Sequence, residues 1–377
     1  MTKHRVKSKS PATSRSKSMR WIIAGVVVSA GVIAYGRFRA PPAASEDAGP
    51  LAASQKHAES TAGSPFAPTV QNQAPAPGSA PQGMVWIPGG EFSMGSDAAS
   101  ESLCSLPGVT RDALPIHRVY VDAFWMDATE VTNEQFERFV KATGYITVAE
   151  QKPTQEEFPN APPENLVAGS TVFTSTPQPV QLNDFFQWWS YVPGADWRHP
   201  AGPESDLKGR EKHPVVQIAY EDAAAYAKWA GKRLPTEAEW EFAARGGVTG
   251  GLYAWGNDLK PGGKFQANIY QGRFPVEGGD TGEDGFKGIA PVAQFQPNAY
   301  GLHDVAGNVW EWVSDVWMNP APLGLKFGGE PRGILRGGAS SYSPRQARAS
   351  YQGFEALGAT CHDVGFRCAL DAIPRRK

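Results

Sequence analysis

Apolar residues recur at helical spacing in only three segments of the chain. Residues 132–144 and 235–247 contain capping boxes, opened by Thr132 and Thr236, and each segment ends in glycine. Residues 220–230 repeat alanine and tyrosine at intervals of three and four, and a glycine follows. We therefore expect three short helices, each with one face buried.

A strand-like pattern begins at Met84. The stretch MVWIPGGEFSMGS contains two apolar runs split by Pro-Gly-Gly, which predicts a strand, a tight turn and a second strand. Residues 252–300, in contrast, are rich in Gly, Pro, Asn, Asp and Trp and keep no periodicity for long. Loops of that length in a compact domain need something else to fix them, and bound cations are the simplest candidate.

The N-terminal part has a different composition. Residues 1–20 carry seven Lys or Arg and no acid, and residues 21–36 are an apolar run. This order is typical of a signal anchor or a signal peptide, with the basic tail in the cytoplasm. The run is short for a membrane span, but no clean cleavage site follows it, so the anchor is favoured. Residues 37–82 are Ala, Pro, Ser and Gly-rich and predict a disordered linker. The folded domain is expected at residues 83–371.

The net charge of −2 conceals an acidic body. Without the basic tail, 29 basic residues face 38 acidic ones, a net charge of −9. Such a body has no electrostatic footprint for a phosphate backbone, so nucleic acid is not expected as a partner. The N-terminal segment instead predicts contact with a membrane, and a domain that is membrane-anchored or secreted on the extracytoplasmic (periplasmic or extracellular) side.

Cysteine is scarce. The three cysteines, Cys104, Cys361 and Cys368, are too few for a disulfide scaffold, and their spacing is not that of a zinc site. An oxidising compartment permits one stabilising disulfide and leaves one thiol over.

Ten segments in order resemble one known family. They include HRVYVDAFWMDATEVTNEQFERFV, HPVVQIAYEDAAAYAKWAGKRLPTEAEWEFAARGG, NAYGLHDVAGNVWEWVSDVW, LRGGAS and GFRCA. Together they resemble the formylglycine-generating enzyme, or sulfatase-modifying factor, domain from about Met84 to Ala369. The resemblance implies an α+β domain related to the C-type-lectin-like fold, low in regular secondary structure and stabilised by two calcium ions.

The resemblance also implies where calcium would bind. Hard oxygen ligands, which calcium prefers, are available in the matching loops. The first site would use the side chains of Asn268 and Asp284 with the carbonyls of Ile269 and Phe286. The second would use the side chains of Asp304 and Glu311 with the carbonyls of Gly307 and Val309. Without the resemblance, turn-forming residues and solvated acids would be the simpler interpretation; with it, structural calcium is favoured.

The family pattern breaks at the catalytic cysteines. In active members, two cysteines five positions apart bind copper(I) and convert a substrate cysteine into formylglycine. Here those positions are Tyr342 and Ala347. A phenol and a methyl group cannot replace thiolates on a soft cuprous ion, so copper is not expected. Tyr342 and Ser343 are candidates for a substrate groove, and the catalytic residues stay unknown.

The resemblance places a structural half-cystine at Cys368. The family's partner position carries no cysteine here, so Cys361 or Cys104 is the candidate replacement, and a disulfide between Cys361 and Cys368 is one pairing. Several tryptophans, including Trp188, Trp189, Trp197, Trp255, Trp310 and Trp312, could line a groove, but large aromatics more often fill cores.

Two functions follow as hypotheses. The first is an exported formylglycine-generating-enzyme-like protein that acts on a peptide or small metabolite without copper and cysteine chemistry. The alternative is a non-catalytic, calcium-stabilised module that binds a peptide or glycan at the cell surface. Whether the chain is an enzyme is left open, because the lost cysteines favour binding whereas the retained framework fits both.

Overall fold

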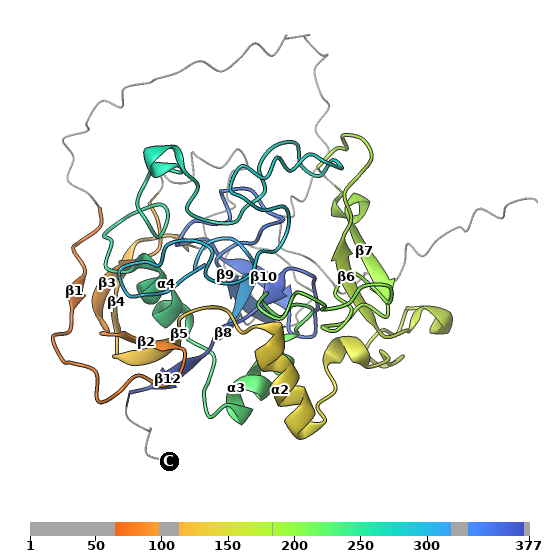
Figure 1. Cartoon of the computed structure of the whole chain (residues 1–377), viewed down its shortest axis with the longest axis horizontal. Coiled ribbons are helices and arrows are strands. Elements are labelled where there is room, and N and C mark those ends of the chain that lie inside the picture. The colour runs from red at the N-terminus through yellow and green to blue at the C-terminus, as the bar shows by residue number, and fades with distance from the viewer. Residues whose placement is uncertain (1–64, 98–112, 183, 318–330, 373–377) are drawn as a thin grey trace, which may run out of the picture.

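The computed structural model describes residues 65–97, 113–182, 184–317 and 331–372 (Figure 1). The predicted basic tail, the apolar segment 21–36, most of the linker and Cys104 lie outside these residues. In the part described, no helix has the length and apolar character needed to cross a membrane.

Four small sheets make up the strand content of the described residues. The first has the order β1-β3-β4, with β1 at Val70–Gln71, β3 at Gly90–Met94 and β4 at His117–Val121. The second has the order β12-β5-β2, with β12 at Ala369–Asp371, β5 at Phe124–Asp127 and β2 at Met84–Ile87. Both are antiparallel, and the second joins the start of the domain to its end.

The other two sheets contribute residues to the pockets described below. One has the order β10-β9-β8-β11, with β10 at Gly353–Ala356, β9 at Arg332–Arg336, β8 at Trp310–Trp317 and β11 at Val364–Gly365. Only its β11–β8 pair is parallel. The other pairs β6 at Gly169–Phe173 with β7 at Trp189–Pro193.

The two predicted strands at the start of the domain belong to different sheets. β2 pairs with β5 whereas β3 pairs with β4. The turn between β2 and β3 therefore connects two different sheets and does not form a hairpin. Gly90 has a φ of 133°, and a Cβ there would lie 2.1 Å from the Val70 carbonyl oxygen. The glycine therefore lets β1 approach β3.

The predicted linker boundary is too late. Residues 65–82 were assigned to the linker, but β1 pairs with β3, and the guanidinium of Arg118 donates to the carbonyls of Ala67 and Pro68. Phe66 packs beneath the guanidinium of Arg245 at 5.7 Å. Scattered apolar residues in a Pro- and Ala-rich stretch give no periodic signal, which is why composition alone missed these contacts.

The three predicted helices are confirmed in the described residues. α2 spans Asn133–Thr143, α3 Tyr220–Trp229 and α4 Glu237–Arg245, and short 3-10 turns lie at Val148–Glu150, Pro163–Asn165, Phe185–Gln187 and Pro261–Gly263. Thr132 and Thr236 form the expected capping boxes, and Gly144 and Gly246 end α2 and α4 in the left-handed conformation.

Two large clusters form the core. One gathers α2, α3 and the inner residues of β8 and β11 around Trp197, Trp312 and Phe366. The second packs α4 against β2, β3 and β5 around Trp240. Five of the six tryptophans considered above are buried and Trp255 is partly buried, as the core interpretation predicted for most of them. The mixed α and β composition with few helices is confirmed.

Candidate functional site

A pocket opens beside β6, where the long loop 252–300 faces the chain after β9. Its volume is about 260 Å³. Phe173 of β6 and His362 form one wall, and the loop forms the opposite wall. The polar and aromatic lining includes Phe173, Tyr270, Asp280, Ser340, Ser341 and His362.

Tyr342 does not line this pocket. Its ring is buried, 5.5 Å from Trp310 in an edge-on arrangement and 6.5 Å from Trp189. Burial raises the pKa of the phenol well above its ordinary value, and the neighbouring Asp363 carboxyl adds to the effect. Ser343 is exposed, and its hydroxyl donates to Gln346 Oε1 at 2.7 Å. The prediction that Tyr342 and Ser343 face a groove is therefore not met by the described pocket, since aromatic packing draws Tyr342 inward.

A small enclosed cavity lies behind Tyr342. Its volume of about 10 Å³ leaves room for one water molecule at most. Cys361, Glu355 and Asp363 line it together with Tyr342. Burial raises the pKa of the Cys361 thiol well above its ordinary value and that of Glu355 to about 8. Burial thus favours the protonated thiol at neutral pH.

The second family cysteine position is equally inert. Ala347 is buried in a separate small cluster with Ala267, Ile269 and Ala306. Neither Tyr342 nor Ala347 carries a thiol, so the cysteine pair of the resembled family is absent by residue type.

His362 connects the pocket to this interior. Its ring lies nearly parallel to Phe173, with centroids 6.0 Å apart, and its Nδ1 accepts the Phe173 backbone N–H at 3.3 Å. Burial lowers the pKa of the imidazole, which favours the neutral ring. Because Nδ1 accepts, the hydrogen of the neutral ring sits on Nε2. Beside it, the Ser341 hydroxyl donates to Asp363, which links the pocket wall to the enclosed cavity.

The candidate disulfide between Cys361 and Cys368 does not form. Both thiols are free and buried. Cys368 lies against Asp127, whose carboxylate accepts the Cys368 backbone N–H at 3.0 Å and pairs with Lys232. Each thiol thus packs as a small buried side chain in its own surroundings. A pairing with Cys104 lies outside the described residues.

The structure brings three of the four residues of the first predicted calcium set together, and the side-chain amide of the fourth, Asn268, donates to other partners. The carboxylate of Asp284 accepts the backbone N–H groups of Ile269 and Phe286, each at 2.9 Å. The Gln271 side-chain amide donates to both the Ile269 carbonyl and Asp284. Burial raises the pKa of Asp284. Two of the predicted ligand oxygens, the Ile269 carbonyl and a carboxylate oxygen of Asp284, therefore lie on the same side-chain amide, that of Gln271.

The second set adjoins the first. The Asn268 side chain donates to Asn308 Oδ1 at 2.9 Å, and the Asn308 backbone N–H donates to the Asn268 carbonyl at 2.8 Å. Gly307, at φ 76°, lies so near that a Cβ would be 2.1 Å from the Asn268 carbonyl oxygen. Asp304 accepts the Ala293 N–H at 2.6 Å.

Glu130 is a member of this region that sequence reasoning missed. It is fully buried, Asn308 donates to its Oε1 at 3.0 Å, and its Oε2 has no hydrogen-bond donor. Burial, and then the charge of Asp304, raise its pKa well above the ordinary value. No sequence signal marks Glu130, because its neighbours come from segments far away in the chain.

Buried carboxyl groups outnumber the cationic side chains here. Glu130, Asp304 and Glu311 share a single guanidinium, that of Arg367. A cation would relieve this imbalance, so the chemistry of the donor set fits a hard metal ion. Within the described ranges, no three His, Cys, Asp or Glu side chains converge as a metal-binding group. A cation at either place would therefore need the backbone carbonyls and the Asn268 amide oxygen as ligands as well.

Comparisons with known proteins point to one family. The sulfatase-modifying factor enzyme 1-like domain matches residues 69–372. Formylglycine-generating enzyme of Mycobacterium tuberculosis is 45% identical over 309 residues, which cover 77% of this chain and 98% of that protein. The bovine (Bos taurus) enzyme is 43% identical over 319 residues, 80% of each chain.

A relative described as inactive is also similar. Inactive C-alpha-formylglycine-generating enzyme 2 of Mus musculus is 38% identical over 295 residues, covering 77% of this chain and 86% of that protein. Among solved structures, PvdO from Pseudomonas aeruginosa superposes with a TM-score of 0.50 at 24% identity, covering 76% of this chain and 94% of that one. That last likeness concerns the fold alone.

Proposed function

Because this chain belongs to the sulfatase-modifying factor enzyme 1-like family, we propose that it recognises a peptide or small metabolite in the pocket beside β6 and forms no formylglycine by the copper-dependent route. The observation that carries the proposal is the side chain at position 342. A phenol buried against Trp310 and Trp189 occupies the first cysteine position, and a methyl group occupies the second.

The pocket offers chemistry suited to a peptide. The His362 Nε2–H is a donor for a carbonyl, the hydroxyls of Ser340 and Ser341 lie on the same lining, and the aromatic ring of Phe173 provides an apolar surface. Asp280 and Lys287 add one negative and one positive group, which could pair with the charged groups of a peptide or amino acid.

A purely binding role is the second candidate. It is supported by the protonated state of Cys361 and Tyr342, which leaves no activated nucleophile in the enclosed cavity. Under this alternative the same pocket would hold a peptide or glycan without turnover.

Calcium is part of the proposal as a structural cofactor. The loops at Asn268–Ile269, Asp284–Phe286 and Asp304–Glu311 would hold it through side-chain and carbonyl oxygens, and the underpaired Glu130 supports a cation nearby. The ion would supply fixed positive charge that holds the irregular loops together. The loops carry the Tyr270 and Asp280 wall of the pocket, so calcium would also shape the binding site.

Two further features complete the proposal. The basic and apolar N-terminal segments support an exported domain, anchored or secreted. The short antiparallel strands, the long loops and the sheet that joins β2 to β12 through β5 support a relation to the C-type-lectin-like fold.

The test is an activity assay with a matched positive control. Purified full-length protein is incubated with copper(I), oxygen and a cysteine-containing sulfatase peptide beside the Mycobacterium tuberculosis relative. We expect aldehyde from the relative and none from this chain, while fluorescence anisotropy detects peptide binding that His362→Ala weakens. Aldehyde formation at a comparable rate in both samples would refute the proposal. Turnover of a different peptide or metabolite, followed by mass spectrometry, would select the enzyme over the binding module.

A further inference from the structure

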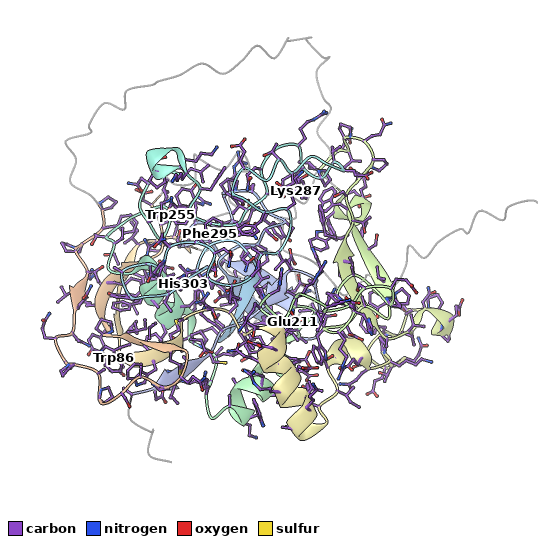
Figure 2. All side chains as sticks on the ribbon, viewed as in Figure 1. Trp86, Glu211, Trp255, Lys287, Phe295 and His303 are labelled. Carbon is purple, nitrogen blue, oxygen red and sulfur yellow. The ribbon has the colours of Figure 1, made fainter. Side chains whose placement is uncertain are left out.

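A second pocket lies apart from the site described above. Its volume is about 220 Å³, and it shares no lining residue with the pocket beside β6. Figure 2 labels one residue of each pocket, Trp255 here and Lys287 there, and the two are well separated in the view. The lining includes Gly246 at the end of α4, the loop that carries Trp255, and residues 296–299 and 304–306.

Trp255 forms a fixed aromatic platform in this pocket. One face of its ring is stacked on Tyr253, with centroids 5.0 Å apart and planes 7° from parallel. Its indole N–H donates to the Asp258 carbonyl at 2.8 Å, so the ring cannot turn freely. The ring is partly buried and also packs against the clusters that contain Leu302 and Ala306, so its accessible apolar surface is what Trp255 offers the pocket.

Uncharged polar groups surround the platform. Gln266 and Gln296 contribute side-chain amides to the lining, and Gln296 is exposed. The side-chain amide of Gln266 donates one hydrogen bond to the Lys264 carbonyl. The NH₂ group has a second hydrogen, which it can donate to a ligand. An amide both donates and accepts, which suits hydroxyl groups on a ligand.

The charged groups of the lining argue against an anionic ligand. The Arg245 guanidinium is already engaged by Glu241 and by the carbonyls of Gly95 and Gly251. Asp304 adds a carboxylate to the lining. The lining therefore offers no free cationic side chain to pair with a phosphate or carboxylate, which favours a neutral ligand.

We propose that this pocket binds a neutral pyranose sugar, either free or at the end of a glycan. A pyranose ring has an apolar face of C–H groups that packs on an aromatic ring, and an edge of hydroxyls that pair with amides and carboxylates. Trp255 supplies the first kind of contact, and Gln266 and Gln296 supply the second. The proposal is independent of the chemistry proposed for the pocket beside β6.

Saturation-transfer NMR on the full-length protein in calcium-containing buffer tests the proposal. The probes are methyl β-D-glucopyranoside, methyl α-D-mannopyranoside and N-acetylglucosamine, each at up to about 20 mM, since one small sugar binds in the millimolar range. At least one probe should bind, and Trp255→Ala should weaken it by about tenfold, equivalent to about 1.4 kcal/mol. Gln296→Ala, at an exposed position, should weaken it several-fold with the melting temperature unchanged.

The control is Tyr120→Ala, which removes an exposed aromatic ring of β4 outside both pockets and should leave sugar binding as it is. If no sugar binds, or if Trp255→Ala and Gln296→Ala both bind like the original protein, the proposal is wrong. Trp255-dependent binding of a peptide without any sugar binding would reject the sugar class.

Discussion

The carboxylate of Glu311 is held at both oxygens by the guanidinium of Arg367, at 2.6 and 2.7 Å. Both side chains are buried, and Trp240 donates a third bond to Glu311 at 2.7 Å. Removing one partner of such a pair leaves an uncompensated buried charge, which costs more than an exposed pair is worth.

Arg367→Met should therefore destabilise the domain by about 3–5 kcal/mol, because Glu311, Asp304 and Glu130 would lose their common cation. Urea unfolding followed by tryptophan fluorescence measures the loss. The control is Lys141→Met, which breaks the exposed Lys141–Glu137 pair and should change the free energy of unfolding by less than about 1 kcal/mol. Equal effects of the two substitutions would contradict the buried role of Arg367.

Removing divalent cations should lower the melting temperature, and calcium should restore it. A ligand present at 100 times its dissociation constant stabilises the folded state by about 2.7 kcal/mol. Scanning calorimetry before and after chelation, with metal analysis of each sample, measures the change. Asp284→Ala should reduce the calcium-dependent part, whereas Asp258→Ala in the same long loop should retain it. An unchanged melting curve after verified calcium removal would reject calcium at both places.

Because Glu355 is buried, we expect the free energy of unfolding to fall as pH rises. Burial raises its pKa in the folded protein to about 8, from an ordinary value of 4.5. An acid whose pKa is higher in the folded than in the unfolded state makes its full contribution to folded-state stability below its pKa in the unfolded state. This contribution is lost as pH rises through its pKa in the folded state. Between pH 5 and 8 the free energy of unfolding should fall by up to about 1.4 kcal/mol per pH unit from this group.

Substitution of Glu355 isolates that contribution. Glu355→Gln keeps the size of the side chain and removes its titration, so its pH dependence should be flatter than that of the original protein. Asp222, whose pKa is raised to about 7 by burial, acts in the same direction and should remain visible in the variant. Urea midpoints across the pH range supply the comparison, and identical slopes in both proteins would overturn this assignment.

Gly307 provides a matched test of backbone approach. Gly307 and Gly209 have φ angles of 76° and 74°, but a Cβ at Gly307 would lie 2.1 Å from the Asn268 carbonyl oxygen whereas nothing lies within 4 Å of one at Gly209. Gly209→Ala should cost about 1–2 kcal/mol, the strain of the left-handed conformation. Gly307→Ala should cost more than about 4 kcal/mol, because the two loops must separate. Similar losses in denaturant unfolding would show that the close approach is unimportant.

Local sequence signals predicted the helices well. The strand pairing depends on long-range contacts and could not be predicted. Thr132 and Thr236 each begin a capping box that involves only four consecutive residues, so both helix starts could be predicted from the sequence. The split of β2 and β3 between two sheets depends on partners far along the chain, which no local pattern reveals.

The same limit applies to the site. The resemblance located Asn268, Asp284, Asp304 and Glu311, and calcium binding by them stays a prediction. The structure brings Ile269 and Phe286 to Asp284. The side-chain amide of Asn268 donates to other partners, and both oxygens of Glu311 accept bonds from Arg367. Burial of Tyr342 and the presence of Glu130 both arise from packing between distant segments. Cys361 and Cys368 share one core cluster, yet both remain thiols, which residue counting could not show.

The short strand β12 has a consequence for biosynthesis. It supplies one edge of the sheet whose other strands, β5 and β2, are synthesised about 245 and about 285 residues earlier. That sheet is incomplete until the last residues of the domain have been made, so an emerging chain cannot close its core stepwise from the N-terminus. Truncation before Ala369 should yield an aggregation-prone product, and a chain that crosses a membrane during synthesis would complete its folding only on the far side.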